Sequence, residues 1–300
     1  MGYVAGDSGH SILDNSPQRK IKIGTCAWTY EDWHRVFYPA GLPQGQWLEF
    51  YARWFGAVEV DSTFYHAPGA KAIAHWLRGT PADFRFSCKM PRQITHEMRL
   101  ADCEEPLREF LANLEPLKPK LGCVVIQLPP NFRPKTGEKT LKQFLGMLPG
   151  GFRFAVEFRH ADWHLPRIVH CLEDHGIAWA WTDTSPLDDQ NRGAFEPLPQ
   201  TAKHLYIRLL GDLSKKYRAD GSRIHRYTSL QWPRDSSLEN WAVKIHKHLP
   251  ETEGVYLNCS NHFEGFAPAT CRRIGQMLDI PIEIPSTGTE PPPQKQMDLL

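Results

Sequence analysis

Eight short apolar runs, each followed by a segment of helix length, constrain most strongly what this 300-residue chain can fold into. Most runs end in charged or amide side chains, which are Glu59, Asp61, Lys89, Gln127, Glu157, Arg159, Asp183, Arg208 and Asn258. An apolar strand that ends in a charge is costly to bury unless charges from neighbouring strands meet it. We therefore expect these ends to converge at one mouth of a closed sheet, where barrels of this architecture carry their chemistry.

The apolar runs predict strands, and the segments between them have the spacing of amphipathic helices. The predicted strands are 21–28, 57–65, 84–90, 122–128, 153–159, 177–183, 204–210 and 254–260. The predicted helices are 47–55, 107–117, 141–148, 165–175, 238–248 and 267–278. Strands that alternate with helices favour parallel βαβ units with right-handed crossovers. We therefore predict an α/β fold, a single (β/α)8 TIM barrel over residues 21–284.

An open doubly wound sheet is the main alternative to the barrel. Such a sheet usually has a glycine-rich phosphate loop after its first strand, and the segment 24–28, Gly-Thr-Cys-Ala-Trp, is not one. The two ends of the chain differ from the rest, because residues 1–20 are polar and residues 285–300 are rich in proline. We predict a mobile N-terminal leader and a mobile C-terminal tail, both flexible and polar.

Composition excludes some classes of protein. A net charge of +1 argues against a constitutive binder of polyanions, although a local basic patch remains an alternative. The first twenty residues have no apolar core of a signal peptide, and no run reaches the length of a membrane span. The seven cysteines are an odd number without a Cys-x-x-Cys pair, which favours reduced, buried thiols. We predict a cytoplasmic protein that does not bind membranes, and the sequence leaves its oligomeric state open.

Several motifs occur in order along the chain. They are Gly24-Thr-Cys-Ala-Trp-Thr-Tyr30, Val58-Glu-Val-Asp-Ser-Thr-Phe-Tyr65, Lys89 with Thr95-His96, Gln127-Leu-Pro-Pro130, Glu157-Phe-Arg-His160 and Arg208 with Gly211. Together they resemble the YecE-like family, also called domain of unknown function seventy-two. The resemblance implies a TIM barrel, and it suggests a relation to the endonuclease IV type of barrel and so to nucleic-acid repair. Family members often have Ser and Gly at Cys26 and Ala27, and Asn at Asp61, so Asp61 adds a negative charge at the mouth.

Strand alternation predicts which polar side chains face the barrel axis. Val58 and Val60 take the outer face of their run, which turns Glu59 and Asp61 inward. The same test turns inward four acids and three bases, which are Glu59, Asp61, Glu157, Asp183, Lys89, Arg159 and Arg208. A nearly neutral set can be buried together, so the alternative to a catalytic site is an ion network that only fixes the register of the barrel.

The predicted catalytic residues are a lysine and carboxylates of this set. Lys89 could lose its proton and attack a carbonyl carbon as a Schiff-base nucleophile, or it could anchor a phosphate or carboxylate. Glu157 and Asp183 could serve as general acid and base, because they end consecutive strands. Glu59 and Asp61 complete the predicted catalytic set.

Basic and aromatic residues near the strand ends predict the binding of a phosphate and of a ring. The loop after the run 204–210 is basic and contains tyrosines, and barrels commonly bind phosphate in this region. The alternative is an ordinary solvated loop. The predicted binding residues are Gln127, Arg159, Arg208, Lys215, Lys216, Arg218, Arg226, Asn258, Trp28, Tyr65 and Trp163.

These residues favour an enzyme that acts on a phosphate-bearing, ring-containing substrate at the barrel mouth. Its most specific form is nucleic-acid processing by a hydrolase or lyase at a damaged base or abasic site, with single-stranded or damaged DNA or RNA as partner. The alternatives are a sugar-phosphate isomerase, aldolase or hydrolase, and a non-catalytic ligand or nucleic-acid binding protein. No cofactor is predicted. A divalent metal stays an alternative because histidines and carboxylates follow several strand ends, although no tight ligand spacing supports it.

Overall fold

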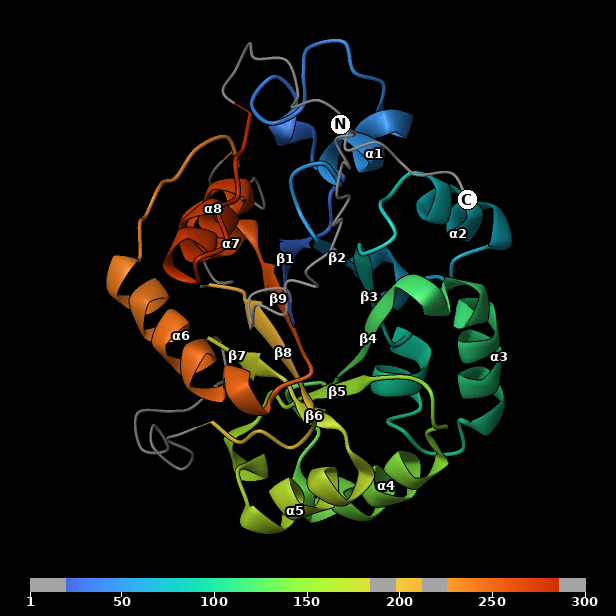
Figure 1. Ribbon diagram of the computed structural model, residues 1–300. Helices are drawn as coiled ribbons and strands as arrows, with labels where there is room; N and C mark the ends of the chain where they lie inside the picture. The colour runs from blue at the N-terminus through green and yellow to red at the C-terminus, as the bar shows by residue number, and fades with distance from the viewer. Residues whose placement is uncertain (1–19, 184–197, 212–225, 286–300) are drawn as a thin grey trace, which may run out of the picture.

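A ring of parallel strands surrounded by helices forms the structure, a computed structural model that describes residues 20–183, 198–211 and 226–285 (Figure 1). Neighbouring strands follow the order β6-β5-β4-β3-β2-β1-β9-β8-β7. The strands are β1 (Ile21–Cys26), β2 (Ala57–Val60), β3 (Arg85–Lys89), β4 (Leu121–Gln127), β5 (Phe154–Glu157), β6 (Ala178–Trp179), β7 (Trp181–Thr182), β8 (His204–Leu209) and β9 (Gly254–Cys259). The predicted α/β barrel is confirmed, and each predicted strand overlaps an observed one.

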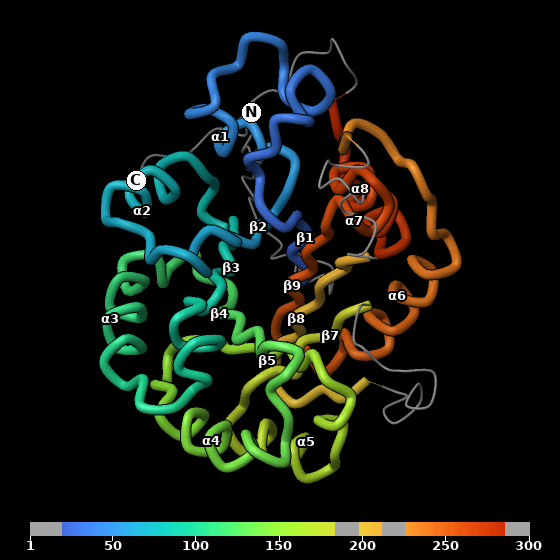
Figure 2. The backbone as a smooth tube through the Cα atoms, turned by 180° about the vertical axis from the view of Figure 1, so that it is seen from behind, coloured from blue at the N-terminus to red at the C-terminus, as the bar shows by residue number. Residues whose placement is uncertain are grey.

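Helices pack around the outside of the ring (Figures 1 and 2). They are α1 (Trp47–Tyr51), α2 (Ala70–Arg78), α3 (Glu104–Leu114), α4 (Pro134–Met147), α5 (Pro166–His175), α6 (Asp235–His248), α7 (Asn261–Glu264) and α8 (Ala267–Met277). Helix α3 buries Leu107, Phe110 and Leu114, which lie three or four residues apart and therefore on one face. Helix α5 begins at Pro166 and ends at the left-handed Gly176, so the sequence fixes both of its ends.

The sixth predicted strand, 177–183, is divided into β6 and β7. β6 pairs with β5, whereas β7 pairs with β8. Between the two, the Ala180 N–H donates to the Val156 carbonyl at 2.9 Å. The Thr201 hydroxyl accepts from the Trp179 N–H at 2.7 Å and donates to the Ile177 carbonyl at 2.6 Å. One predicted strand thus becomes two short ones that face different neighbours.

Alternation along the strands separates an outer core, packed against the helices, from a small core inside the barrel. Val58, Val156 and Ile207 belong to the outer core. The inner core consists of Cys123, Val125, Ala155, Ala178, Ala180, Tyr206 and Tyr256. Small alanines opposite two tyrosines fill the barrel, as expected for a packed interior rather than a pore. The site candidates lie beyond this core, at the carboxyl ends of the strands.

The observed elements differ from the predicted ones mainly where apolar periodicity is weak. Residues 61–64 form a 3-10 turn, Asp61–Phe64, instead of continuing a strand, and a π-helical turn, Gln93–Glu97, follows β3. Helices α2 and α7 were not predicted. Helix α7 has only four residues, whereas α2 is amphipathic and buries Ile73 and Trp76, so its pattern was overlooked. Helix α4 starts at Pro134 instead of residue 141, because its first turns are polar.

Three further predictions concern the chain as a whole. All seven cysteines are buried and unbonded to one another, which agrees with the predicted reduced thiols. Within the described ranges, no helix is both long and apolar enough to cross a membrane. The predicted mobile leader and tail, apart from Lys20 and Pro285, lie outside the described residues.

Candidate functional site

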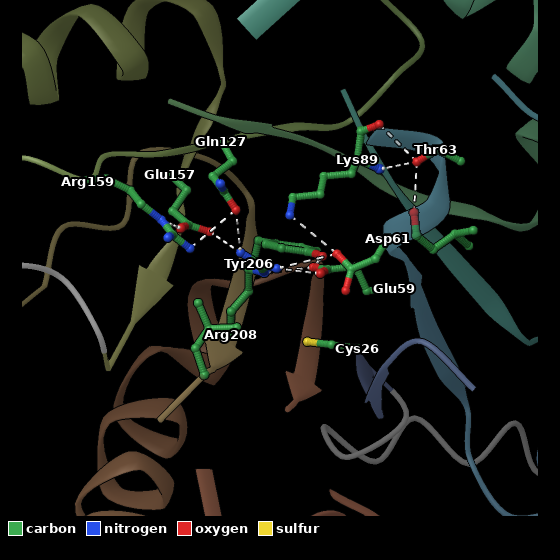
Figure 3. Close-up of polar contacts among 12 residues, drawn as sticks. Cys26, Glu59, Asp61, Thr63, Lys89, Gln127, Glu157, Arg159, Tyr206 and Arg208 are labelled. Atoms are coloured by element: carbon green, nitrogen blue, oxygen red, sulfur yellow. Dashed lines mark hydrogen bonds and ion pairs between the residues drawn. The ribbon is translucent and has the colours of Figure 1, made fainter. Parts of the chain in front are cut away.

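A buried arginine joins two glutamates across the interior of the barrel (Figure 3). Arg208 on β8 donates from Nε to Glu59 Oε2 at 2.8 Å and from Nη2 to Glu59 Oε1 at 2.6 Å. Its Nη1 donates to Glu157 Oε2. Only 3% of the Arg208 side chain is exposed, and both glutamates are fully buried. We call Glu59, Arg208 and Glu157 the charged floor of the mouth.

Two further side chains complete the hydrogen bonding of the floor. The Tyr206 hydroxyl donates to Glu59 Oε2, and Gln127 Oε1 accepts from Arg208 Nη1 at 3.2 Å. Gln127 is level with Glu157 because β4 and β5 pair in register at these residues. Tyr206 was missed as a candidate, although its position two residues before Arg208 places it on the same strand face.

Lys89 and Asp61 lie next to the floor and are more accessible. Lys89 Nζ is 3.4 Å from Asp61 Oδ1, with 12% and 37% of the two side chains exposed. Asp61 Oδ1 is also 3.8 Å from Arg208 Nη2, so it adjoins the floor. The Thr63 hydroxyl lies within hydrogen-bond distance of the Val60 and Lys89 carbonyls, one of which takes its hydrogen, and it accepts from the Lys89 N–H. These contacts fix the turn after β2 against β3 (Figure 3).

Arg159 approaches the mouth from the end of β5. Its Nε donates to Glu157 Oε1, and its Nη2 donates to Gln127 Oε1 at 3.3 Å. About a fifth of the side chain is exposed, whereas Glu157 is buried. We call Lys89, Asp61 and Arg159 the outer tier of the mouth, since a ligand can reach them and not the charged floor beneath.

The electrostatic surroundings separate the pKa values of two neighbouring carboxyls. Burial and the nearby Asp61 carboxylate raise the pKa of Glu59, although Arg208 opposes the rise. Burial alone would raise the pKa of Asp61, but Lys89 and Arg208 outweigh it and lower that pKa. Two carboxyls whose pKa values are shifted in opposite directions are suited to different roles in proton transfer. Of the two, Asp61 is the accessible carboxyl and the one whose lowered pKa favours the ionised form.

Glu157 and Arg208 are held in their charged forms. Burial would raise the pKa of Glu157, but Arg208 and Arg159 lower it to about 2. Burial likewise disfavours the charge of Arg208, yet Glu157 and Glu59 outweigh burial and raise its pKa. Each of these buried charges is stabilised by the opposite charge beside it, which offsets the cost of burying it in the barrel.

Cys26 is the last residue of β1, beside the floor, and Ala27 directly follows it. Burial, and then the charge of Glu59, raises the pKa of the Cys26 thiol well above its ordinary value, so the thiol is neutral. Ala27 has a φ of 64°, in the left-handed region that favours glycine, and its N–H donates to the Glu59 carbonyl at 2.9 Å. The strained alanine therefore holds the end of β1 to β2.

A family model described as "Protein of unknown function DUF72" matches residues 22–297. The chain belongs to the DUF72 family. The predicted YecE-like identity is thereby confirmed. The UPF0759 protein YecE of Escherichia coli K12 is 38% identical over 140 residues, which are 47% of this chain and 48% of YecE. The UPF0759 protein YunF of Bacillus subtilis is 24% identical over 277 residues, 87% of this chain and 95% of YunF. The match to YecE thus spans about half of that relative's length.

Solved DUF72 structures have the same fold. A DUF72 family protein of Thermotoga maritima superposes with a TM-score of 0.72 at 26% identity, over 86% of this chain and 99% of that one. A DUF72 family protein of Enterococcus faecalis gives a TM-score of 0.69 at 20% identity, over 88% and 97% of the two chains. The names of these relatives state no activity, so membership of DUF72 establishes the barrel and not a reaction.

Asp183 lies apart from the other predicted catalytic residues of the DUF72 chain. Its carboxylate accepts from the Leu210 N–H at 2.6 Å, from the Gly211 N–H at 3.0 Å and from Arg234 Nη1 at 3.0 Å. Burial raises its pKa, against these donors. Asp183 thus binds the loop after β8 and Arg234, and its role as acid or base beside Glu157 stays a prediction.

Asn258 is level with Arg208 but is buried below the outer tier. Neither its Oδ1 nor its Nδ2 has a hydrogen-bond partner among the described residues. Direct contact with a ligand, which the sequence predicted for Asn258, would require the barrel interior to open.

The predicted aromatic residues fall into three environments. Trp163 is fully buried, stacks on Phe132 and donates from its indole N–H to the Phe132 carbonyl at 2.6 Å, so the expected ligand contact is wrong for it. Trp28 is partly buried against Trp76. Tyr65 is 68% exposed and packs edge-on against Phe64, which leaves its ring available to a ligand.

Most of the predicted basic loop lies outside the residues that the structure describes. Lys215, Lys216 and Arg218 lie outside the described residues, whereas Arg226 is described and exposed. Within the described residues, no group of three or more His, Cys, Asp or Glu side chains could hold a metal ion.

Proposed function

We propose that the chain is an enzyme that binds a phosphate-bearing substrate at the carboxyl-end mouth of its barrel, with Lys89 and Arg159 holding the phosphate. The observation that carries this proposal is the division of the charges into a buried floor and an accessible outer tier. The floor is satisfied internally, so its charges need no ligand. The Lys89 and Arg159 side chains are partly exposed, 12% and 22%, and so can contact one.

Further cations on the same side of the mouth support a phosphate ligand. Arg92 and Arg99 flank the turn after β3, and they act electrostatically on His96 together with Lys89 and Arg159. Guanidinium and ammonium groups are the usual protein ligands of phosphate oxygens, and arginine can bind two of them at once.

Asp61 is the proposed proton-transfer residue, because it is ionised and reachable by a substrate. Lys89 is the proposed anchor of the phosphate and not a Schiff-base nucleophile. It forms an ion pair with Asp61, in which lysine is the charged ammonium, whereas the nucleophile is the neutral amine.

A single-stranded or damaged nucleic acid is the substrate class that we propose to test first. The exposed Tyr65 ring supports it, because it packs against the Phe64 ring that Lys89 Nζ also contacts. Bases stack on aromatic faces while cations follow the phosphates. A sugar phosphate fits the outer tier equally well but does not need Tyr65.

Calorimetric titration with inorganic phosphate tests the anion site. Lys89→Met and Arg159→Met should each weaken binding by about tenfold at low salt. Lys142→Met is the matched control, because Lys142 pairs with Glu138 on the outer helix α4 and should leave binding unchanged. Equal affinity in all four proteins would contradict the proposal.

Oligonucleotide binding separates the substrate classes. A single strand with an abasic site should bind more tightly as salt falls, and Tyr65→Ala should weaken this binding while leaving phosphate affinity intact. Tyr65→Phe keeps a stacking face and should behave as the unaltered protein. Undetectable oligonucleotide binding at low salt rejects the nucleic-acid substrate and leaves a sugar phosphate, whereas a borohydride-trapped adduct on Lys89 would reassign that lysine as nucleophile.

A further inference from the structure

His96 lies in the turn after β3, and its hydrogen bonds define the state of its ring. The Thr95 hydroxyl donates to the Pro91 carbonyl at 3.1 Å and lies 2.9 Å from His96 Nδ1. A hydroxyl has a single hydrogen to donate, so when Thr95 donates it to the Pro91 carbonyl, the Thr95 oxygen accepts the bond from Nδ1. We assign His96 to this tautomer, in which Nδ1 carries the proton and Nε2 a lone pair.

The remaining surroundings of the His96 ring leave Nε2 available. The ring packs edge-on against Phe64, with centroids 5.1 Å apart, and it is only partly buried. Nε2 makes no hydrogen bond to a residue that the structure describes. Lys89 Nζ lies 4.8 Å from the centroid of the same Phe64 ring, so His96 and the proposed phosphate anchor share one aromatic neighbour.

Four cations from three elements surround His96. Lys89 ends β3, Arg92 and Arg99 flank the π-helical turn, and Arg159 follows β5. Burial is the largest cause that lowers the pKa of His96, followed by the charges of Lys89, Arg92, Arg159 and Arg99, and together they lower it to about 4.

The nearby carboxylates are already paired with these cations. Glu97 lies 3.4 Å from Arg92, Asp61 lies 3.4 Å from Lys89, and Glu157 accepts from Arg159. No carboxylate among the described residues forms an ion pair with the His96 ring. A negatively charged ligand bound near these cations would therefore offset their repulsion of a proton on the His96 ring.

We infer that His96 is a further substrate-binding residue of the mouth, which takes up a proton at Nε2 when an oxyanion binds to the outer tier. The proton comes from solvent, and the new Nε2–H donates a hydrogen bond to an oxygen of the anion. Nδ1–H keeps its bond to Thr95 throughout, so the ring does not need to turn. The inference rests on the proposed anion site and adds a residue to it.

Titration with sulfate tests the inference, because sulfate itself carries no proton near neutral pH. Calorimetry at pH 5.5 in two buffers with different heats of ionisation measures the protons taken up per sulfate bound. The free ring is almost entirely neutral at this pH, so we expect uptake of roughly half a proton or more. His96→Gln, whose amide does not titrate, should still bind sulfate but lose this uptake.

The possible results distinguish the inference from the proposed function. Sulfate binding without proton uptake, or with the same uptake in His96→Gln, overturns the role of His96 and leaves the anion site intact. No sulfate binding by the unaltered protein overturns both.

Nitrogen NMR of the imidazole provides a second measurement that needs no ligand. The free protein should show a protonated Nδ1 and an unprotonated Nε2 for His96. Thr95→Ser, which keeps the hydroxyl, should preserve this tautomer, and Thr95→Val should lose it. A proton on Nε2 in the unaltered protein at pH 7 overturns the inference.

Discussion

Arg208 binds both carboxylate oxygens of Glu59 through two different nitrogens, at 2.8 and 2.6 Å, in the dry interior of the barrel. The two residues come from β8 and β2, which are not neighbours in the sheet. Glu157 on β5 binds the same guanidinium from a third direction. The charged floor therefore connects three separate strands of the ring, in addition to the hydrogen bonds between adjacent strands.

Replacing Arg208 by methionine should strongly destabilise the protein. The substitution leaves two buried carboxyls without their cation, and breaking one side of a buried ion network typically costs about 3–5 kcal/mol. The free energy of unfolding from urea denaturation measures this loss. Lys89→Met is the control, because its ion pair is partly exposed and should contribute less than about 1 kcal/mol. A loss below 1 kcal/mol in Arg208→Met would contradict the account of the floor.

The stability of the protein should fall steeply in acid. Glu157 has a pKa near 2 in the folded protein and an ordinary value of 4.5. Because the folded-state pKa is the lower one, the carboxylate stabilises the fold above pH 4.5, and this contribution disappears as the pH falls toward 2. The contribution is about 3 kcal/mol at most, since each pKa unit corresponds to about 1.4 kcal/mol. Between pH 5 and pH 2, the free energy of unfolding should therefore fall less in Glu157→Gln than in the unaltered protein. An equal fall in both proteins would show that Glu157 does not cause the loss of stability in acid.

Replacing Ala27 by glycine should stabilise the protein. The φ of 64° at Ala27 strains any residue with a Cβ, and glycine removes a strain of about 1 kcal/mol, partly offset by its larger entropy loss on folding. We expect a higher midpoint of thermal unfolding. Ala112→Gly is the matched control, because Ala112 is exposed within helix α3 and the same change there should lower the midpoint. A decrease in both variants would show that the backbone at Ala27 is not strained.

Replacing Asp61 by asparagine should tighten the binding of inorganic phosphate. The substitution removes a negative charge 3.4 Å from Lys89 Nζ while keeping the size of the side chain. We expect affinity to rise by about threefold to tenfold at low salt and the gain to shrink as salt is added. Asp83→Asn, at an exposed carboxylate before β3 that pairs with Lys22, should have no effect. Weaker binding in Asp61→Asn would indicate that Asp61 itself contacts the ligand.

The barrel could be predicted from the sequence because strand and helix patterns alternate without interruption. The inward direction of Glu59, Glu157 and Arg208 followed from the period of two along a strand, and these three side chains do meet. Strand periodicity predicts which way a side chain faces, but not which other side chain it contacts. It therefore could not separate the buried floor from the outer tier.

The remaining differences arise where side chains leave the regular strands. Asp183 follows β7, and its carboxylate accepts from the backbone N–H groups of Leu210 and Gly211 instead of joining the charged floor. Trp163 lies in a 3-10 turn that folds back onto the outer core, so its place after a strand did not make it a mouth residue. Tertiary contacts of this kind carry no signal at the level of local sequence.

The sheet is interrupted between β6 and β7, because β6 pairs with β5 and β7 pairs with β8. We call this interruption the seam of the barrel. Beside β6 the Thr201 hydroxyl bonds to the backbone of Ile177 and Trp179, at positions where a neighbouring strand would offer backbone groups. A side-chain hydroxyl can rotate away, whereas a backbone ladder must separate as a unit. The barrel should therefore open locally at this seam first. The amide hydrogens of β6 and β7 should exchange with solvent sooner than those between β1 and β9.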